Sequence, residues 1–207
     1  MSARPAIIVL AAGKGSRFQG IHHKLAQPLG LCSMLEATVA NVAATGLSLL
    51  VVTTAALIDL VAPQAQRGEV LLLPEAGSSA SRELGMGYSI AAGVAARSEA
   101  SGWLIVPADM PLMQPSTLMA VADALNDSTI AYPQYNGMRG HPIGFGAELY
   151  SELVRLTGDE GARRLLARYP GQSVTVDDPG VLLDIDTVED LERARDTMAV
   201  SPFGLLR

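Results

Sequence analysis

The sequence predicts an α/β protein with a Rossmann-like three-layer α/β/α architecture, in which a mostly parallel sheet carries a local antiparallel excursion. Short apolar runs of β type alternate along the chain with alanine-rich stretches of helical character, as in doubly wound sheets. Several of the early runs are apolar throughout, which is typical of parallel strands covered on both faces. Hydrophobic residues make up 49% of the 207 residues but aromatic residues only 4%, so small aliphatic side chains must build the core.

The expected strands and helices follow one another along the chain. We expect strands at residues 7–11, 49–53, 70–73, 103–106, 130–132, 142–145 and 174–176. We expect helices at residues 34–44, 57–62, 86–96, 116–125, 147–156, 161–168 and 188–198. Pro115-Ser116 opens one helix, with Ser116 as its cap. Thr187 and Asp190 form a pair that resembles a capping box before the last helix.

The antiparallel excursion is expected in the second half of the chain. Residues 130–145 contain two strand-like pieces around the expected turn Asn136-Gly137-Met138-Arg139-Gly140, without a helix predicted between them. We expect one domain over residues 1–200, followed by a short tail at 201–207. In sheets of this kind, ligands bind at the carboxyl ends of the strands, where the winding direction changes.

Composition limits the partners and the compartment. The formal net charge of −6 argues against nucleic acid, so an anion must be held by a local cluster of donors or through a metal. The single cysteine, Cys32, cannot form an internal disulfide and fits a reducing compartment. No apolar run approaches the about 20 residues that span a bilayer, and no signal peptide is recognisable, so we expect a cytoplasmic protein without a membrane partner.

The run Leu10-Ala11-Ala12-Gly13-Lys14-Gly15-Ser16-Arg17 is the first candidate for chemistry. A strand that ends in a glycine-rich turn leaves backbone N–H groups pointing outward, which suits a polyphosphate. Lys14, Arg17 and Lys24 place three cations close to this turn. The alternative is a tight turn that uses glycine for conformational reasons alone. The run is neither G-x-G-x-x-G nor a Walker pattern, which disfavours a standard dinucleotide fold and a P-loop ATPase.

A carboxylate follows the expected strand at 103–106. Asp109 lies between Pro107 and Pro111, which fix the backbone and present the side chain rigidly at the end of the strand. A hard cation such as Mg²⁺ takes oxygen ligands of this kind, supplemented by waters and substrate phosphates. The alternative role for Asp109 is that of a turn or helix-cap residue.

A second acidic group precedes the last helix. Asp184 and Asp186 flank Ile185, so in an extended segment both carboxylates would share one face. That face could complete a metal site with Asp109. The alternative is that Asp186 or Thr187 only caps the last helix.

Loops with small residues are further candidates. Gly77-Ser78-Ser79 and Gly85-Met86-Gly87 suit the approach of a flat base to the backbone. His141, directly before Pro142, could contact an acceptor or relay a proton, or it could be structural. His22 and His23 do not have the spacing of a zinc site.

The motifs occur together in an order that resembles a known family. They are Leu10-Ala11-Ala12-Gly13-x-Gly15-Ser16-Arg17 with Lys24, Ala108-Asp109-Met110-Pro111, Gly140-His141-Pro142, Gly158-Asp159-x-Gly161-Ala162-Arg163 and Asp184-Ile185-Asp186-Thr187. From residue 7 to residue 191 the chain resembles the MobA-like nucleotidyltransferase superfamily, and most closely the molybdenum cofactor cytidylyltransferases. In these motifs the chain departs from the common cytidylyltransferase pattern at one place. The stretch from Arg17 to Lys24 is longer, and His23 stands where proline usually precedes the lysine.

The resemblance implies a role for each matched residue. Arg17, Lys24 and Asp109 would be catalytic, and Asp109 with Asp186 would hold Mg²⁺. Ala12, where guanylyltransferase relatives usually have glycine, implies cytosine as the base. The nucleotide-binding set would be Leu10, Ala11, Ala12, Gly13, Lys14, Gly15, Ser16, Arg17, Lys24, Ser78, Gly85, Met86, Ser89 and Asp109. The acceptor-binding set would be His141, Asp159 and Arg163.

The implied reaction transfers CMP from CTP to the phosphate of molybdopterin or the molybdenum cofactor and releases pyrophosphate. A molybdoenzyme is a further partner that the resemblance allows. Three alternatives stay open at this point. The first is a guanylyltransferase or sugar-phosphate nucleotidyltransferase on the same fold, and the second is an NAD(P)H-dependent oxidoreductase relative. The third is a non-catalytic protein that delivers the cofactor.

Overall fold

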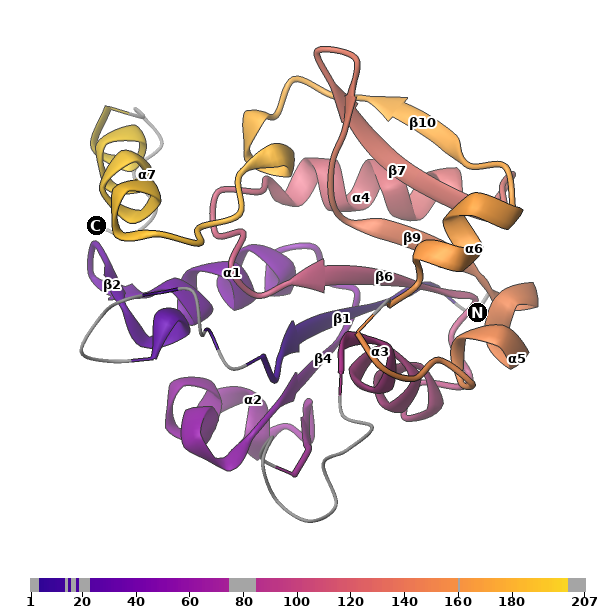
Figure 1. The fold of residues 1–207 in the computed structure, drawn as a ribbon, viewed down its shortest axis with the longest axis horizontal. Helices are drawn as coiled ribbons and strands as arrows, with labels where there is room; N and C mark the ends of the chain where they lie inside the picture. Colours follow the sequence, from indigo (N-terminus) through magenta and orange to yellow (C-terminus); the bar gives the residue numbers. More distant parts are fainter. Residues whose placement is uncertain are drawn as a thin grey trace.

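A central sheet of eight strands organises the structure. The computed structural model describes residues 4–13, 15, 18, 23–74, 85–159 and 161–200. The strand order is β10-β7-β9-β6-β1-β4-β5, and β8 pairs with β7 (Figure 1). The strands are β1 (Ala6–Ala11), β4 (Ser48–Thr53), β5 (Val70–Leu72), β6 (Gly102–Pro107), β7 (Ile130–Tyr135), β8 (Met138–Arg139), β9 (Ile143–Gly146) and β10 (Gln172–Thr175). All seven strands expected from the sequence are present, and β8 is an addition.

The sheet is mostly parallel, as predicted. β1 pairs in parallel with both β4 and β6, β4 pairs with β5, and β10 pairs with β7. The excursion is β9, which runs antiparallel to both of its neighbours, β6 and β7. β7 and β8 form a hairpin whose turn residues, Asn136 and Gly137, have φ values of 49° and 78°. Such values favour asparagine and glycine at a tight hairpin turn.

Helices alternate with the strands, which confirms the predicted fold class. They are α1 (Met34–Ala43), α2 (Ala62–Gln66), α3 (Met86–Ala95), α4 (Pro115–Ala124), α5 (Tyr150–Leu153), α6 (Arg163–Arg168) and α7 (Val188–Val200). Short 3₁₀ helices are η1 (Lys24–Ala26), η2 (Ala55–Val61), η3 (Ala147–Leu149) and η4 (Pro179–Leu182). In the described part of the chain, no helix combines the length and the apolar character that crossing a membrane requires.

Two expected helices take a different form. The stretch expected as a helix at 57–62 is the 3₁₀ helix η2, and α2 follows it. Pro63 lacks the N–H that a continuous α-helix through this stretch would need. The stretch expected at 147–156 begins as η3 and continues as α5, which ends at Leu153. The small hairpin of β2 (Pro28–Leu29) and β3 (Cys32–Ser33) was not expected from the sequence.

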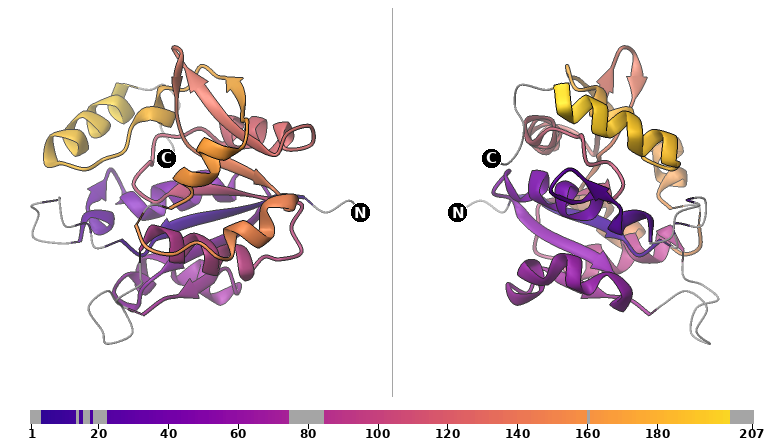
Figure 2. Two further views of the ribbon diagram at one scale, coloured as in Figure 1. Left: turned by 45° about the vertical axis from the view of Figure 1, so that its right-hand side comes forward. Right: turned by 90° about the vertical axis from the view of Figure 1, so that its left-hand side faces the viewer.

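Each face of the sheet carries its own apolar core. Alternate residues of β1 enter the two cores, because successive side chains of a strand point to opposite faces. Ile7 and Val9 pack in one core with side chains of α1, α4 and α7, whereas Ala6 and Ile8 pack in the other with side chains of α3, α5 and α6. α7 also lies beside the β2–β3 hairpin (Figure 2). There Arg195 donates to the Pro28 carbonyl at 2.6 Å. The three layers therefore follow from the apolar strands predicted from the sequence.

The last helix begins with the capping pair that the sequence predicts. The Asp190 N–H donates to Thr187 Oγ1 at 3.1 Å, and the Thr187 N–H donates to Asp190 Oδ2 at 2.8 Å. Hydrogen bonds from Thr187, opposed in part by desolvation, lower the pKa of Asp190 to about 2. Arg193 forms a further ion pair with the same carboxylate. The cap is therefore built from Thr187 and Asp190 and does not use the side chain of Asp186 as its acceptor.

The expectation for Ser116 is wrong. α4 begins at Pro115 with Gln114 as its N-cap, because the fixed φ of proline suits the first helical position. The missing cap acceptor comes from the buried side chain of Asp178. Its Oδ2 accepts from the Gln114 N–H at 2.9 Å and from Thr117 Oγ1 at 2.7 Å, and its Oδ1 accepts from the Gly180 N–H at 3.0 Å. Asp178 thus joins η4 to the start of α4.

Replacement of Asp178 by alanine should destabilise the fold strongly. It removes the acceptor for three donors, of which Thr117 and Gly180 are buried, and leaving buried donors unpaired costs about 1–3 kcal/mol each. We expect the free energy of unfolding in urea to fall by about 3 kcal/mol. Asp177→Ala is the matched control, because Asp177 is the exposed neighbour and should change stability by about 0.5 kcal/mol or less. Equal stabilities of the two variants would contradict this role.

Replacement of Asp190 by alanine should cost about 1 kcal/mol, the usual effect of a lost cap. The folded pKa of about 2 lies below the ordinary value of 3.8, so this contribution is present above pH 3.8 and is lost as the pH falls toward 2. Urea unfolding of both proteins at pH 6 and at pH 3 tests the claim. The stability difference should shrink at pH 3, and a difference of constant size would contradict it.

Candidate functional site

The glycine loop lies at the carboxyl end of β1, between the ends of β4 and β6. Gly13 and Gly15 are its described glycines. Gly15 has a φ of 58°, and a Cβ at this position would lie 3.1 Å from Lys24 Cβ. Glycine therefore allows both the left-handed backbone at this position and the close approach of η1, the turn that carries Lys24 and is called the lysine turn below. Lys14, Ser16, Arg17 and Ser78, which the sequence analysis also places in the nucleotide site, lie outside the described residues.

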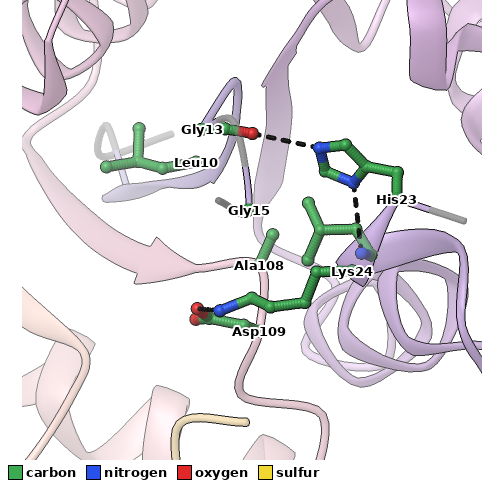
Figure 3. A pocket seen from close by; sticks show the side chains of 8 residues that line it. Leu10, Gly13, Gly15, His23, Lys24, Ala108 and Asp109 are labelled. Atoms are coloured by element: carbon green, nitrogen blue, oxygen red, sulfur yellow. Dashed lines mark hydrogen bonds and ion pairs between the residues drawn. The ribbon is translucent and has the colours of Figure 1, made fainter. Parts of the chain in front are cut away.

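Lys24 joins the two predicted acidic groups. Its Nζ donates to Asp109 Oδ2 at 2.6 Å (Figure 3). The same Nζ donates to Asp186 Oδ1 at 2.7 Å. The lysine side chain is only 8% exposed, and the carboxylates are 22% and 29% exposed. Burial alone would lower the pKa of Lys24, but the hydrogen bonds and charges of both aspartates outweigh it and raise the pKa above 10.5. Lys24 is therefore a cation throughout the neutral range.

Asp109 is held by the loop that follows β6. Thr38 and Asn41 of α1 are buried polar residues that donate to the carbonyls of Ala108, at 2.9 Å, and Pro111, at 2.8 Å. The Asp109 carboxylate contacts a lysine, and its Oδ1 is a buried atom that accepts no hydrogen bond from any described residue. The helix-cap alternative for Asp109 is therefore not what the structure shows.

Asp186 and Asp184 take different positions. The Ile185 N–H donates to the Asp109 carbonyl at 3.0 Å, which fixes this segment against the end of β6. Ile185 itself is buried, and Asp186 next to it reaches Lys24. Asp184 is exposed, and its charge acts on His141. Thr187 therefore caps the helix together with Asp190, whereas Asp186 faces the lysine, so capping is not the whole role of this motif.

His141 lies at the border of this acidic cluster. Its backbone N–H donates to the Val181 carbonyl at 2.9 Å, and its peptide bond to Pro142 is cis. Desolvation by the surrounding protein lowers the pKa of His141 below 6.5, although the charges of Asp109 and Asp184 act against this. The imidazole is therefore neutral at pH 7.

A second group of predicted residues meets at the start of α3. The Gly87 N–H donates to the Gly158 carbonyl at 2.8 Å, and a Cβ on Gly85 would lie 2.4 Å from Asp159 Oδ1. The predicted nucleotide segment and the predicted acceptor loop thus pack directly on each other. Met86 is 55% exposed beside this contact. Ser89 is buried, and its hydroxyl donates to Gly85 within the helix at 3.4 Å.

Arg163 of the predicted acceptor set is exposed on the first residue of α6. Sequence reasoning did not assign Asp178, Thr38, Asn41 and His23, which all hold the site in place. The signal for Asn41 was present, because a polar side chain stands among apolar residues on the buried face of a helix. Asp178 offered no such signal, because Asp177 and Asp178 are indistinguishable in an acidic turn.

A cavity of about 100 Å³ opens between the glycine loop and the lysine turn (Figure 3). Its lining residues are Leu10, Gly13, Gly15, His23, Lys24, Leu25, Ala108 and Asp109. Within the described ranges no cluster of three or more His, Cys, Asp or Glu side chains could hold a metal ion. Two carboxylates, one with an unpaired oxygen, suit a hard cation that completes its shell with waters and phosphates, as Mg²⁺ does.

Comparisons with known proteins show the family to which the chain belongs. A family model described as the MobA-like NTP transferase domain matches residues 7–174. The purine catabolism protein PucB of Bacillus subtilis is 35% identical over 122 residues, which are 56% of this chain and 59% of PucB. The match therefore spans less than two thirds of that relative.

Solved structures share the fold over almost the whole chain. Rv0371c from Mycobacterium tuberculosis H37Rv has a TM-score of 0.75 at 26% identity, and the match covers 95% of this chain and 100% of that chain. A manganese complex of Rv0371c matches with a TM-score of 0.70 at 25% identity and the same coverage. Molybdopterin-guanine dinucleotide biosynthesis protein A from Archaeoglobus fulgidus shows the same fold at 15% identity, with a TM-score of 0.67, 95% of this chain and 100% of that chain. With a family model that covers residues 7–174 and a lysine–carboxylate cluster beside the glycine loop, the chain belongs to the MobA-like NTP transferase domain family.

Proposed function

We propose that the protein transfers CMP from CTP to the phosphate of a molybdopterin-type acceptor, with a divalent metal, and releases pyrophosphate. The observation that carries the proposal is the position of Lys24, which lies between two carboxylates at the end of the glycine loop. A cation and two acidic groups beside a glycine-rich loop are the parts that a nucleoside triphosphate and its metal require.

In the proposed reaction, cationic groups balance the negative charge of the triphosphate and carboxylates bind the metal ion. The backbone of the glycine loop, Arg17 and Lys24 would neutralise the triphosphate, and Asp109 with Asp186 would hold Mg²⁺. The metal, when bound, stabilises the negative charge that develops on the phosphoryl oxygens. An acceptor phosphate oxygen forms a bond to the α-phosphorus while the bond from that phosphorus to the β-phosphate oxygen breaks. Positioning and charge neutralisation supply the catalysis, and no protein nucleophile is needed.

The metal proposal has support from outside the chain. Rv0371c, which is 25% identical in that comparison, has been solved as a complex with manganese. Manganese and magnesium both take carboxylate oxygens and waters, so the same pair of aspartates suits either ion. We therefore assign Mg²⁺ to Asp109 and Asp186 as the expected ion in the cell.

The choice of nucleotide and acceptor is the finer part of the proposal. Ala12, half-buried directly after β1, stands where guanylyltransferase relatives usually have glycine, and this favours cytosine. His141, Asp159 and Arg163 would contact the acceptor. The neighbour from Archaeoglobus fulgidus is described as a molybdopterin-guanine dinucleotide biosynthesis protein, which supports an acceptor of the molybdopterin class.

Pyrophosphate release with CTP, GTP or ATP tests the reaction directly, with and without purified molybdenum cofactor and with Mg²⁺ present. We expect release with CTP that depends on the cofactor. Faster release with GTP would assign the protein to the guanylyltransferases instead. No release with any of the three nucleotides, from protein that is folded by circular dichroism, would contradict the proposal.

Asp109→Asn should reduce kcat/KM by at least about 100-fold, because an amide carries no charge for the metal. The fold should persist, since asparagine keeps the size of the side chain. Asp123→Asn is the control, because Asp123 is exposed on α4, the helix that follows the same loop. Asp109→Asn activity within a few-fold of the control would contradict the metal role.

Lys24→Met should make the isolated protein bind Mn²⁺ more tightly, by about tenfold or more. The ammonium contacts both carboxylates and balances one of their two negative charges, so a divalent cation competes with it for the same oxygens. Titration of Mn²⁺ without nucleotide, followed by electron paramagnetic resonance, measures this affinity. Because the pKa of Lys24 is raised, the difference should be the same at pH 6 and pH 9.

Lys24→Arg keeps the cation and serves as the control for that titration. It should bind Mn²⁺ no more tightly than the wild type does. Weaker or equal Mn²⁺ binding by Lys24→Met would contradict the placement of the metal on Asp109 and Asp186.

A further inference from the structure

His23 joins two segments of backbone through both nitrogens of its ring. Its Nδ1 lies 3.2 Å from the Leu25 N–H, and its Nε2 lies 3.1 Å from the Gly13 carbonyl oxygen (Figure 3). A backbone N–H can only donate, so Nδ1 must be the acceptor. In a neutral imidazole the other nitrogen then carries the proton and donates to Gly13. Both bonds therefore require the neutral imidazole with its proton on Nε2.

Each end of this bridge holds a part of the candidate site. Leu25 belongs to η1, for which His23 is the N-cap, and η1 carries Lys24. Gly13 lies in the glycine loop that follows β1. A Cβ on Gly15 would lie 3.1 Å from Lys24 Cβ and 3.7 Å from His23 Cε1, so the loop and the turn are also in close contact. The ring of His23 lines the cavity between them.

The hydrogen bonds of His23 affect two properties of the glycine loop that matter for phosphate binding, namely its conformational freedom and the direction of the Gly13 carbonyl. Glycine has many accessible conformations, so a loop of this kind loses entropy when it closes on a ligand. A carbonyl oxygen that faces a phosphate also repels it. The donor on His23 engages the Gly13 oxygen and fixes its direction.

We infer that His23 is a positioning residue that sets the glycine loop and Lys24 at a fixed separation for the nucleotide phosphates. The inference rests on the proposed function, because it takes a nucleoside triphosphate as the ligand of this site. His23 acts through Gly13 and Lys24, and it takes no proton from the reacting groups.

Two substitutions separate the two bonds of the ring. Asparagine places its amide oxygen near the position of Nδ1, so His23→Asn keeps the cap on Leu25 but does not reach Gly13. Glutamine places its amide near the position of Nε2, so His23→Gln keeps a donor for Gly13 and loses the short cap. His23→Ala removes both bonds.

The experiment measures three quantities for the wild type and the three variants. They are the midpoint of thermal unfolding, the affinity for CTP with Mg²⁺ by calorimetry, and kcat and KM for pyrophosphate release. We expect His23→Asn to unfold at the wild-type temperature but to lose about tenfold in CTP affinity and in kcat/KM. His23→Gln should recover most of that affinity at a lower midpoint, and His23→Ala should lose both.

Two results would overturn the inference. The first is wild-type CTP affinity in His23→Asn, which would leave His23 as a cap of η1 only. The second is a parallel loss of stability and affinity in all three variants, which is the pattern of a structural residue. The outcome for His23 is separable from that of the proposed function, because CTP affinity is measured without turnover. A wild type that binds CTP but releases no pyrophosphate would contradict the reaction and leave the test of His23 in force.

Discussion

The ammonium of Lys24, shared by the carboxylates of Asp109 and Asp186, is the interaction on which the site depends. It joins η1, which carries the lysine, to the loop after β6 and to the segment before α7. Asp109 lies 85 residues and Asp186 lies 162 residues from Lys24 along the chain. Removing three charges from water is costly, and such clusters contribute little net stability when compared with apolar packing. A buried cluster of this kind is therefore more readily explained by function than by folding.

The surrounding fold brings the three members of this cluster together. Parallel strands bring the glycine loop and Asp109 to the same edge of the sheet, since β1 and β6 are neighbours in parallel register. Thr38 and Asn41 of α1 donate hydrogen bonds to carbonyls of the loop that carries Asp109. Asp178 accepts from the Gln114 N–H and so connects η4 to the start of α4. The segment that carries Asp186 begins after the end of η4. The buried hydrogen bonds of Asp178, which fix η4, therefore also help to position the second carboxylate.

The sequence predicts the scaffold better than it predicts the contacts. Strands buried on both faces can be predicted from the sequence because they are apolar throughout. Asp109 can be predicted as a site residue because prolines flank it at the end of such a strand. The pairing of Lys24 with the two aspartates cannot be predicted from the sequence, because it depends on the conformation of the loop that precedes the lysine. Ser116 was expected as a cap from local preference alone. The structure replaces it with Asp178, a residue 64 positions beyond the capped N–H, and long-range contacts of this kind leave no local pattern. His23 is missed for the same reason, since its role depends on a carbonyl ten residues earlier.

A crystal structure with Mn²⁺ and a non-hydrolysable CTP analogue would show whether Asp109 and Asp186 hold the metal. The anomalous signal of manganese distinguishes the ion from a water molecule. We expect one manganese peak within coordination distance of both Asp109 and Asp186, with the Lys24 ammonium withdrawn from the pair and in contact with a phosphate oxygen. A manganese ion held elsewhere, with Lys24 still bound to both carboxylates beside the bound nucleotide, would contradict it.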